Sequence, residues 1–322
     1  SRGQVYWLKV YEVPQGSRIS KGKPIVNLFP LMPGEKINAI LVVEDFVDDK
    51  FIFMATSKGT VKKTPLSDFS NPRKSGIIAI KLDNGDYLVG ASITNGKNDI
   101  VLVSSGGKAV WFDENDVRSM GRNARGVRGM KLVQEHQVLS LLIAESEEES
   151  VLVATENGYG KRTVLSEFRK SGRGTQGVKA IQVSDRNGIV VSARLVGDQD
   201  EIMLITTGGV LIRTRVSEIR ELGRATQGVT LINLGVDEKL SGLEKIVEPE
   251  EQPYTGEQRG NLIQDLDRQI EQLQPTSSLM NVPAFPDDTQ ALPTEDPSTR
   301  MALAGDNPDN QLIAMRGIAG LG

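Results

Sequence analysis

Short apolar runs recur along the first 247 residues, each with a polar pair, a glycine and a second short run. The five copies are SRGQVYWLK (1–9), FIFMATSKGTVKKT (51–64), IVLVSSGGKAVWF (100–112), VLVATENGYGKRT (151–163) and IMLITTGGVLIRT (202–214). Short runs rich in β-branched residues predict strands, and the glycine supplies the positive φ that a tight turn needs. The pattern therefore predicts one β-hairpin in each copy.

A second glycine follows each hairpin glycine at a nearly constant distance, so the hairpin belongs to a larger repeating unit. The hairpin glycines are Gly3, Gly59, Gly107, Gly158 and Gly209, and the second glycines are Gly22, Gly76, Gly126, Gly177 and Gly228. Further apolar runs before the hairpin and after the second glycine bring the unit to four short strands. Four strands in roughly 40–50 residues are typical of a propeller blade, whereas a solenoid would cover its sheets by stacking. We therefore predict an all-β chain of the propeller type.

One segment, GRGTQG at 172–177, contains the glycine spacing of a dinucleotide-binding loop. Such a loop needs a strand before it and a helix after it, but the run VKAIQV that follows is strand-like. The equivalent segments are GRNARG at 121–126 and GRATQG at 223–228, which share with it only the outer glycines and one arginine. These arginines are Arg122, Arg173 and Arg224. We therefore interpret the segment as a basic loop between strands.

Lysines and arginines gather on these loops and on the second strand of each hairpin. Equivalent positions of successive propeller blades lie around one rim, so these side chains are expected to form a curved basic track. Such a track suits the phosphates of duplex DNA, since aromatic residues that stack on single strands make up only 5% of the chain. The candidate DNA-binding residues are Arg18, Lys21, Lys23, Lys62, Lys63, Arg73, Lys74, Arg122, Arg125, Arg128, Lys161, Arg162, Arg169, Lys170, Arg173, Arg213, Arg215 and Arg224. The alternative is that these side chains only protect strand edges and turns.

The net charge of −4 conceals a basic body and an acidic tail. Residues 1–247 carry 34 lysines and arginines against 29 acids, whereas residues 248–322 carry 4 against 13. The Pro-rich and acidic composition predicts a largely disordered tail with a short amphipathic helix over 261–274. The expected domains are therefore a propeller over 1–247, truncated at its first blade, and a tail over 248–322. The tail either competes with DNA for the basic rim or serves as a solubilising linker.

Several classes of chemistry find no support in the composition. The chain has no cysteine and one histidine, His136, which excludes disulfides, thiol catalysis and Cys- or His-rich metal sites. No apolar run approaches the roughly 18 residues of a membrane span. The acids at 145–149 are interpreted as a solvated loop, and no catalytic or metal-binding set is predicted.

The repeated motifs resemble the C-terminal domain of the A subunit of DNA gyrase. The resemblance rests on GYGKRT followed by EFRKSGRGTQGVKAI, and on RTRVSEIRELGRATQGVTLI, VRSMGRNARGVRGMKL and ATSKGTVKKTPLSDF, and it covers about residues 1–247. It implies a six-bladed β-pinwheel whose neighbouring blades exchange strands, with about five blades recognisable here. It also implies that the domain wraps duplex DNA chirally for ATP-dependent negative supercoiling. The family's Q-R-R-G-G-K-G box of the first blade is absent from this sequence.

The resemblance further implies partners, cofactors and a location. The partners are double-stranded DNA and the rest of gyrase A together with gyrase B in an A2B2 complex, in the bacterial cytoplasm at the nucleoid and without a membrane. No cofactor is expected in this chain, because ATP, magnesium and the catalytic tyrosine belong to other parts of the enzyme. The alternatives are the C-terminal domain of the related subunit of topoisomerase IV and a protein-interaction propeller with an apolar top face. A propeller enzyme would need acids or histidines near the central channel.

Overall fold

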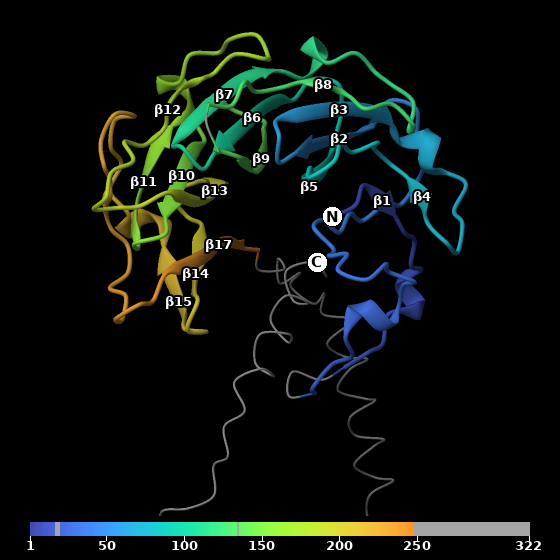
Figure 1. Cartoon of the computed structure of the whole chain (residues 1–322), viewed down its shortest axis with the longest axis horizontal. Helices are drawn as coiled ribbons and strands as arrows, with labels where there is room; N and C mark the ends of the chain where they lie inside the picture. Colours follow the sequence, from blue (N-terminus) through green and yellow to red (C-terminus); the bar gives the residue numbers. More distant parts are fainter. Residues whose placement is uncertain (17–19, 134, 248–322) are drawn as a thin grey trace, which may run out of the picture. The chain divides into compact units, whose positions relative to one another are not determined.

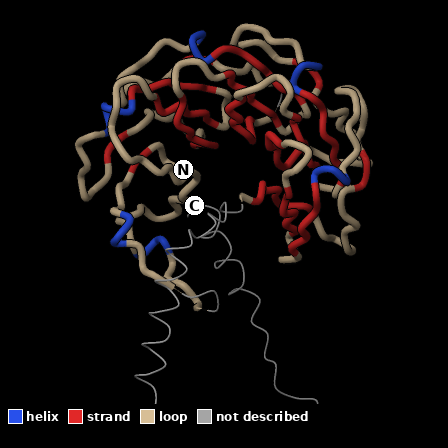
Figure 2. Tube along the Cα trace, turned by 180° about the vertical axis from the view of Figure 1, so that it is seen from behind, coloured by secondary structure: helices blue, strands red, loops and turns tan. Residues whose placement is uncertain are grey.

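The computed structural model describes residues 1–16, 20–133 and 135–247. Figures 1 and 2 show this part as a series of small β-sheets with short helices in the connections. Arg18, the predicted helix over 261–274 and the whole predicted tail lie outside the described residues. Among the residues that are described, no helix is long and apolar enough to cross a membrane. The all-β prediction is confirmed.

Four of the five predicted hairpins form as antiparallel pairs. They are β2 (Phe51–Thr56) with β3 (Thr60–Pro65), β6 (Asp99–Ser104) with β7 (Lys108–Asp113), β10 (Ser150–Thr155) with β11 (Tyr159–Val164), and β14 (Glu201–Thr206) with β15 (Leu211–Arg215). Their turn glycines have φ values between 73° and 81°. A short 3-10 helix follows each hairpin: η3 (Leu66–Phe69), η4 (Glu114–Asp116), η5 (Leu165–Glu167) and η6 (Val216–Glu218).

The first copy departs from the prediction, because only two residues precede Gly3 and cannot form a first hairpin arm. The two-residue strand β1 (Gln4–Val5) pairs instead with β4 (Ile77–Ile78), a strand of the following repeat. Two further 3-10 helices, η1 (Val10–Glu12) and η2 (Ile25–Asn27), are the other regular elements described before residue 51.

A third strand joins the first arm of each hairpin. These strands are β5 (Leu88–Thr94), β9 (Val138–Ala144), β13 (Val190–Val196) and β17 (Leu240–Ile246). Each pairing shifts register at the same place, just before the last residue of the hairpin arm, as between Ala55 and Thr56. Figure 1 shows β5, β9, β13 and β17 on the inner side of the series, where each contacts the next one.

The fourth strand of a sheet comes from the following repeat. Strand β8 (Val127–Arg128) pairs with β3, β12 (Val178–Lys179) with β7, and β16 (Val229–Thr230) with β11. The register is identical each time, as in the pairs Val61↔Val127 and Thr60↔Arg128. This confirms the strand exchange that the resemblance implied. The last sheet has only three strands, in the order β15-β14-β17.

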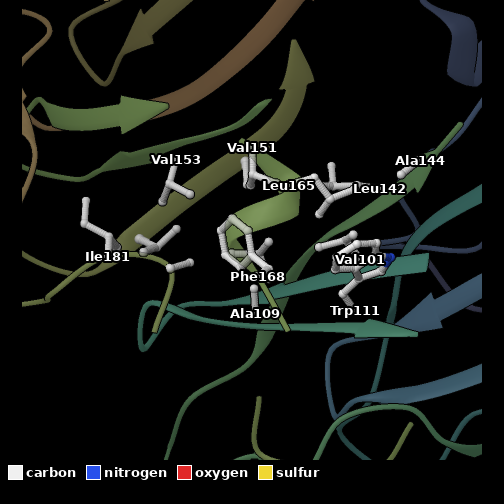
Figure 3. Close-up of a cluster of buried hydrophobic side chains, with 14 residues drawn as sticks. Val101, Ala109, Trp111, Leu142, Ala144, Val151, Val153, Leu165, Phe168 and Ile181 are labelled. Atoms are coloured by element: carbon white, nitrogen blue, oxygen red, sulfur yellow. The ribbon is translucent and has the colours of Figure 1, made fainter. Parts of the chain in front are cut away.

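The hydrophobic core lies between neighbouring sheets, so the central strands are covered on both faces. Figure 3 shows Phe168 and Trp111 packed among Val101, Leu142 and Val151, side chains that come from two adjacent sheets and from the turn after β11. The alternate residues of the same strands, including Ile100 and Phe112, face the preceding sheet. Because successive side chains point to opposite faces, burial of both faces requires an unbroken apolar run rather than an alternating one.

The hairpin glycines test how closely adjacent repeats are packed. In the Gly107→Ala variant a Cβ would lie 2.6 Å from the Ile181 carbonyl oxygen of the next repeat. The matched control is Gly85→Ala, which has a φ of +69° but meets only the Lys58 amine, at 3.7 Å. We expect Gly85→Ala to lower the free energy of unfolding by about 1–2 kcal/mol and Gly107→Ala by roughly a further 1–3 kcal/mol. Urea denaturation measures both, and equal losses would contradict the close packing.

Candidate nucleic-acid interface

The three basic loops at 121–126, 172–177 and 223–228 are joined in a row by backbone hydrogen bonds. The Lys131 N–H donates to the Thr175 carbonyl at 2.8 Å, and the Gln182 N–H donates to the Thr226 carbonyl at 2.8 Å. Each donor belongs to the segment that leaves the preceding loop. We call residues 121–131, 172–182 and 223–233 the loop row. Its members are brought together by the strand exchange and not by closeness in the sequence.

The last glycine of each loop lets the backbone cross the hairpin of the preceding repeat. A Cβ on Gly126, Gly177 or Gly228 would lie 2.2–2.6 Å from a carbonyl oxygen of β3, β7 or β11, and all three φ values are positive. The middle glycine of the dinucleotide-like pattern, Gly174, also has a positive φ, of +79°, but the nearest atom to its Cβ would be 3.5 Å away. The outer glycine Gly177 is therefore needed for packing between repeats, in the described residues as in the comparison of the sequence copies.

Arg173 anchors the middle loop to the preceding repeat. Its Nε donates to the Asp116 carbonyl at 2.8 Å and its Nη1 donates to the Arg128 carbonyl at 3.0 Å. The Gly174 N–H donates to the Gly129 carbonyl at 2.6 Å, so backbone and side chain hold the same loop. This guanidinium positions the loop, and only its remaining N–H groups are available to an external anion.

Lys62 and Lys161, both predicted as DNA contacts, have fully buried side chains. The Lys161 amine donates to the Gly223 carbonyl at 2.6 Å and to the Thr163 hydroxyl at 2.9 Å. The Lys62 amine donates to the Ala79 carbonyl at 2.6 Å and to the Arg122 carbonyl. Both lysines therefore hold a basic loop of the following repeat by its backbone. Their amines do not reach the surface, and we remove both from the candidate DNA contacts.

Burial also changes the protonation of these two lysines. Desolvation lowers the pKa of Lys62 and that of Lys161 to about 8, against a partial opposing effect from Asp68 and Glu167 respectively. A neutral amine keeps two N–H donors, enough for the two acceptors around each nitrogen. The equivalent positions of the other two hairpins are the apolar Val110 and Ile212.

The next position along the second hairpin arm is engaged within the protein as well. Lys63 is 4% exposed, donates to Asn115 Oδ1 at 3.1 Å, lies 3.6 Å from Glu114 and covers the Phe51 ring. The Nε of Arg162 donates to the Ile219 carbonyl at 2.8 Å, and its Nη1 pairs with Asp198. These contacts remove Lys63 from the candidate surface and leave Arg162 with a mainly structural role, because the run of basic letters does not distinguish inward from outward side chains.

On β15, Arg213 and Arg215 are exposed, and both pair with Glu201, at 3.7 Å for Arg215. Lys170 is exposed but pairs with Asp99 at 2.7 Å and lies over the Trp111 ring. That contact with Asp99 raises the pKa of Lys170. These side chains are accessible and partly neutralised.

The remaining predicted cations are accessible or half-accessible. Arg122 and Arg224 are half-buried at the start of their loops, and Arg125 pairs with Asp83 while its side chain stays 66% exposed. The fully exposed members of the prediction are Lys21, Lys23, Arg73, Lys74, Arg128 and Arg169. Most of the accessible cations lie on the loop row or on the corresponding loops of the earlier repeats.

The structure adds two exposed lysines to the loop row, Lys131 and Lys179. Lys131 shares a hollow with Lys108 and Gln176, and Lys179 shares another with Arg224 and Glu167. A positional signal for both exists in the sequence, since Lys179 and Arg128 each lie two residues after a second glycine, and Lys131 and Lys81 each lie five residues after one. Cations from adjacent repeats therefore meet between the loops.

The buried amines give a pH-dependent prediction. A lysine whose folded pKa is about 8 and whose ordinary pKa is 10.5 binds fewer protons in the folded state between these values. The free energy of unfolding of the unaltered chain minus that of Lys161→Met should therefore rise from pH 8 to pH 10.5, by roughly 1–3 kcal/mol. Urea denaturation across this range measures it. The exposed Lys97→Met variant is the control for loss of one cation, and a pH-independent difference for Lys161→Met would contradict the burial argument.

Comparison with known proteins agrees with this architecture. The family model described as DNA gyrase C-terminal domain, beta-propeller, matches residues 1–44, 50–95, 98–145, 149–196 and 200–246. Among solved structures, the C-terminal domain of DNA topoisomerase IV has a TM-score of 0.72 at 28% identity, with 82% of this chain and 81% of that chain covered. The DNA gyrase A C-terminal domain has a TM-score of 0.66 at 28% identity, with 76% and 80% covered.

Curated relatives are named as the A subunit of DNA gyrase. The protein of Salmonella typhimurium is 51% identical over 249 residues, and that of Escherichia coli K12 is 49% identical over 249 residues. Each match covers 77% of this chain but 28% of the relative, so the chain spans less than a third of those proteins. With all five repeats matched by the family model, the chain belongs to the family of DNA gyrase C-terminal domains.

Proposed function

We propose that this chain binds duplex DNA along the loop row and acts as the DNA-wrapping domain of a gyrase A protein. The observation that carries the proposal is the recurrence of accessible cations on equivalent loops of successive repeats, joined by hydrogen bonds between those loops. A single basic loop would be an ordinary surface feature. A series of them presents positive charge at regular steps, as a phosphate backbone presents negative charge.

The chemistry of the row favours phosphates over bases. Lysine and arginine side chains at loop positions attract the backbone of any sequence, and counterion release makes such binding strongly dependent on salt. Bending a duplex over successive loops costs about 1–6 kcal/mol by elastic estimates, which repeated contacts offset. We therefore expect affinity with little sequence preference.

The candidate contacts follow from accessibility in the described residues and from the sequence-based prediction. They are Lys21, Lys23, Arg73, Lys74, Arg122, Arg125, Arg128, Lys131, Arg169, Lys170, Lys179 and Arg224, with Arg213 and Arg215 at the end of the series. Arg173 and the buried Lys62 and Lys161 support the loops from behind. Loss of a supporting residue should alter binding through loop position rather than through lost charge.

The whole protein in which this domain works is proposed from its relatives' name. With the rest of gyrase A and with gyrase B, the domain would contribute DNA wrapping to ATP-dependent negative supercoiling. The cleaving tyrosine, ATP and magnesium would belong to other parts of that A2B2 complex. The chain alone would therefore not be an enzyme, and its place would be at the bacterial nucleoid.

A topoisomerase IV domain is the second candidate, favoured by the TM-score of 0.72 against 0.66 for the gyrase domain. Both solved structures are 28% identical to this chain, whereas curated gyrase relatives reach 51%. Sequence similarity therefore supports gyrase, and the two candidates share the DNA-binding role.

Removing charge from the loop row should weaken binding and reduce its salt dependence. In the double variant Arg128→Gln/Lys131→Gln, each lost phosphate contact should lower the slope of log K against log salt concentration by about 0.9. The matched control is Lys50→Gln/Lys97→Gln, which removes the same charge from exposed side chains outside the loop row. Fluorescence anisotropy with a labelled duplex over a salt series measures the slopes, and equal effects of both double variants would contradict the loop row as the interface.

Chiral wrapping should leave a topological trace. The full chain is bound to nicked circular DNA, the nick is ligated, and the linking number is read on a gel after the protein is removed. We expect a positive shift that grows with the amount of bound protein. The Arg128→Gln/Lys131→Gln variant at equal occupancy is the comparison, and no shift with the unaltered chain would reduce the proposal to DNA binding without wrapping.

A further inference from the structure

The last sheet lacks the strand that closes the outer edge of the others. Strands β3, β7 and β11 each pair on that edge with a strand of the next repeat, but β15 pairs only with β14 in the described residues (Figure 1). The side chains register the difference. Ile212 on β15 is 37% exposed, whereas the equivalent Lys62, Val110 and Lys161 are at most 1% exposed.

The turn before β15 is also shaped for an absent partner. The Gly59 carbonyl accepts the N–H groups of Gly129 and Met130, and the carbonyls of Gly107 and Gly158 each accept two equivalent N–H groups. The returning chain passes 2.6 Å from the position that a Cβ would take on each of these glycines. Gly209 has the same backbone, with φ at +81°, yet no described atom lies within 4 Å of that position. One side of the junction is therefore formed while the other side is absent from the described residues.

A closing segment must match the pattern shared by the four exchanged strands. These segments are Gly76–Ile80, Gly126–Met130, Gly177–Ile181 and Gly228–Ile232. Each has glycine, then Val or Ile, a variable residue, an apolar or small residue, and Ile or Met. The glycine crosses the hairpin, the second residue packs beneath the loop, and the last two donate their N–H groups to the hairpin glycine.

One stretch of the sequence after Val247 fits this pattern. Residues 317–321 read GIAGL and are preceded by Arg316, as Gly126 is preceded by Arg125. The other glycines followed by at least four residues, Gly256, Gly260 and Gly305, precede Glu, Asn and Asp. A polar residue at that point would be placed against the neighbouring hairpin, where the other repeats have Val or Ile.

We propose that residues 316–321 of this chain add to the outer edge of β15 as its fourth strand. The register of the other sheets then sets the pairs, with Leu211 opposite Ile318 and Val210 opposite Ala319, as Val61 is opposite Val127 and Thr60 opposite Arg128. Gly320 and Leu321 would donate their N–H groups to the Gly209 carbonyl. The 69 intervening residues span up to roughly 200 Å when extended, and loop closure costs grow only slowly with length. The chain would thus cover its own open edge against pairing with other chains.

The absence of cysteine from the sequence allows a direct test by engineered pairing. The full-length double variant Val210→Cys/Ala319→Cys is oxidised and digested, and the disulfide-linked peptides are quantified by mass spectrometry. The control pair Val210→Cys/Ala304→Cys lies on the same tail outside the matching stretch. We expect a linked monomer in high yield for the first pair only. Equal yields would mean that the tail is merely tethered, and linked dimers would mean that a second copy covers the edge; either result overturns the proposal.

Hydrogen exchange tests the same pairing without new cysteines. Amides of 209–215 should exchange about tenfold or more faster in a chain that ends at residue 314 than in the full chain, because unpaired edge amides lose protection. The Ile318→Asp variant should behave as the shortened chain does, and the control Met315→Asp should behave as the full chain does. Equal exchange in the full and shortened chains overturns the proposal. Neither readout depends on DNA, so failure here is distinct from failure of the wrapping function.

Discussion

The architecture depends on one junction, in which the chain leaving each loop crosses the hairpin of the preceding repeat and completes its sheet. Two N–H groups of the crossing segment bond to the hairpin glycine carbonyl, and a glycine on each side permits the approach. A side chain at either glycine would overlap a carbonyl oxygen at 2.2–2.6 Å. The junction therefore accounts for two glycines in every repeat, and it makes each sheet incomplete without the next repeat.

The same junction creates the candidate interface. Loops that are far apart in sequence become neighbours because each is attached to the exit of the previous one, as in the Lys131–Thr175 hydrogen bond. Buried amines then fix two loops by their carbonyls, while Arg173 fixes the third by its guanidinium. Structural cations and surface cations thus lie a few residues apart along the chain. Charge close behind the loops supports their shape, and charge on the loops is available to a polyanion.

Much of the fold could be predicted from residues alone, for a simple reason. A strand between two sheets is buried on both faces, and runs such as IVLV at 100–103 record that burial directly. The alignment of copies also separated Gly177, which packing requires, from the chance spacing that resembled a nucleotide loop. The first repeat was mispredicted as a hairpin because its motif continues after Gly3 while its first arm has too few residues before it.

The sequence by itself determined the repeat, its turns, its strands and the location of basic charge. The tertiary structure alone decided which cations face outward. Lys62 and Lys161 read as part of a basic run, yet the loop of the following repeat closes over them and lowers their pKa values to about 8. Lys131 and Lys179 read as isolated charges, yet strand exchange brings them beside the loops of the next repeat. The reason is that burial of a side chain in a two-residue-period strand depends on what crosses it, and here the crossing segment comes from about 60 residues away.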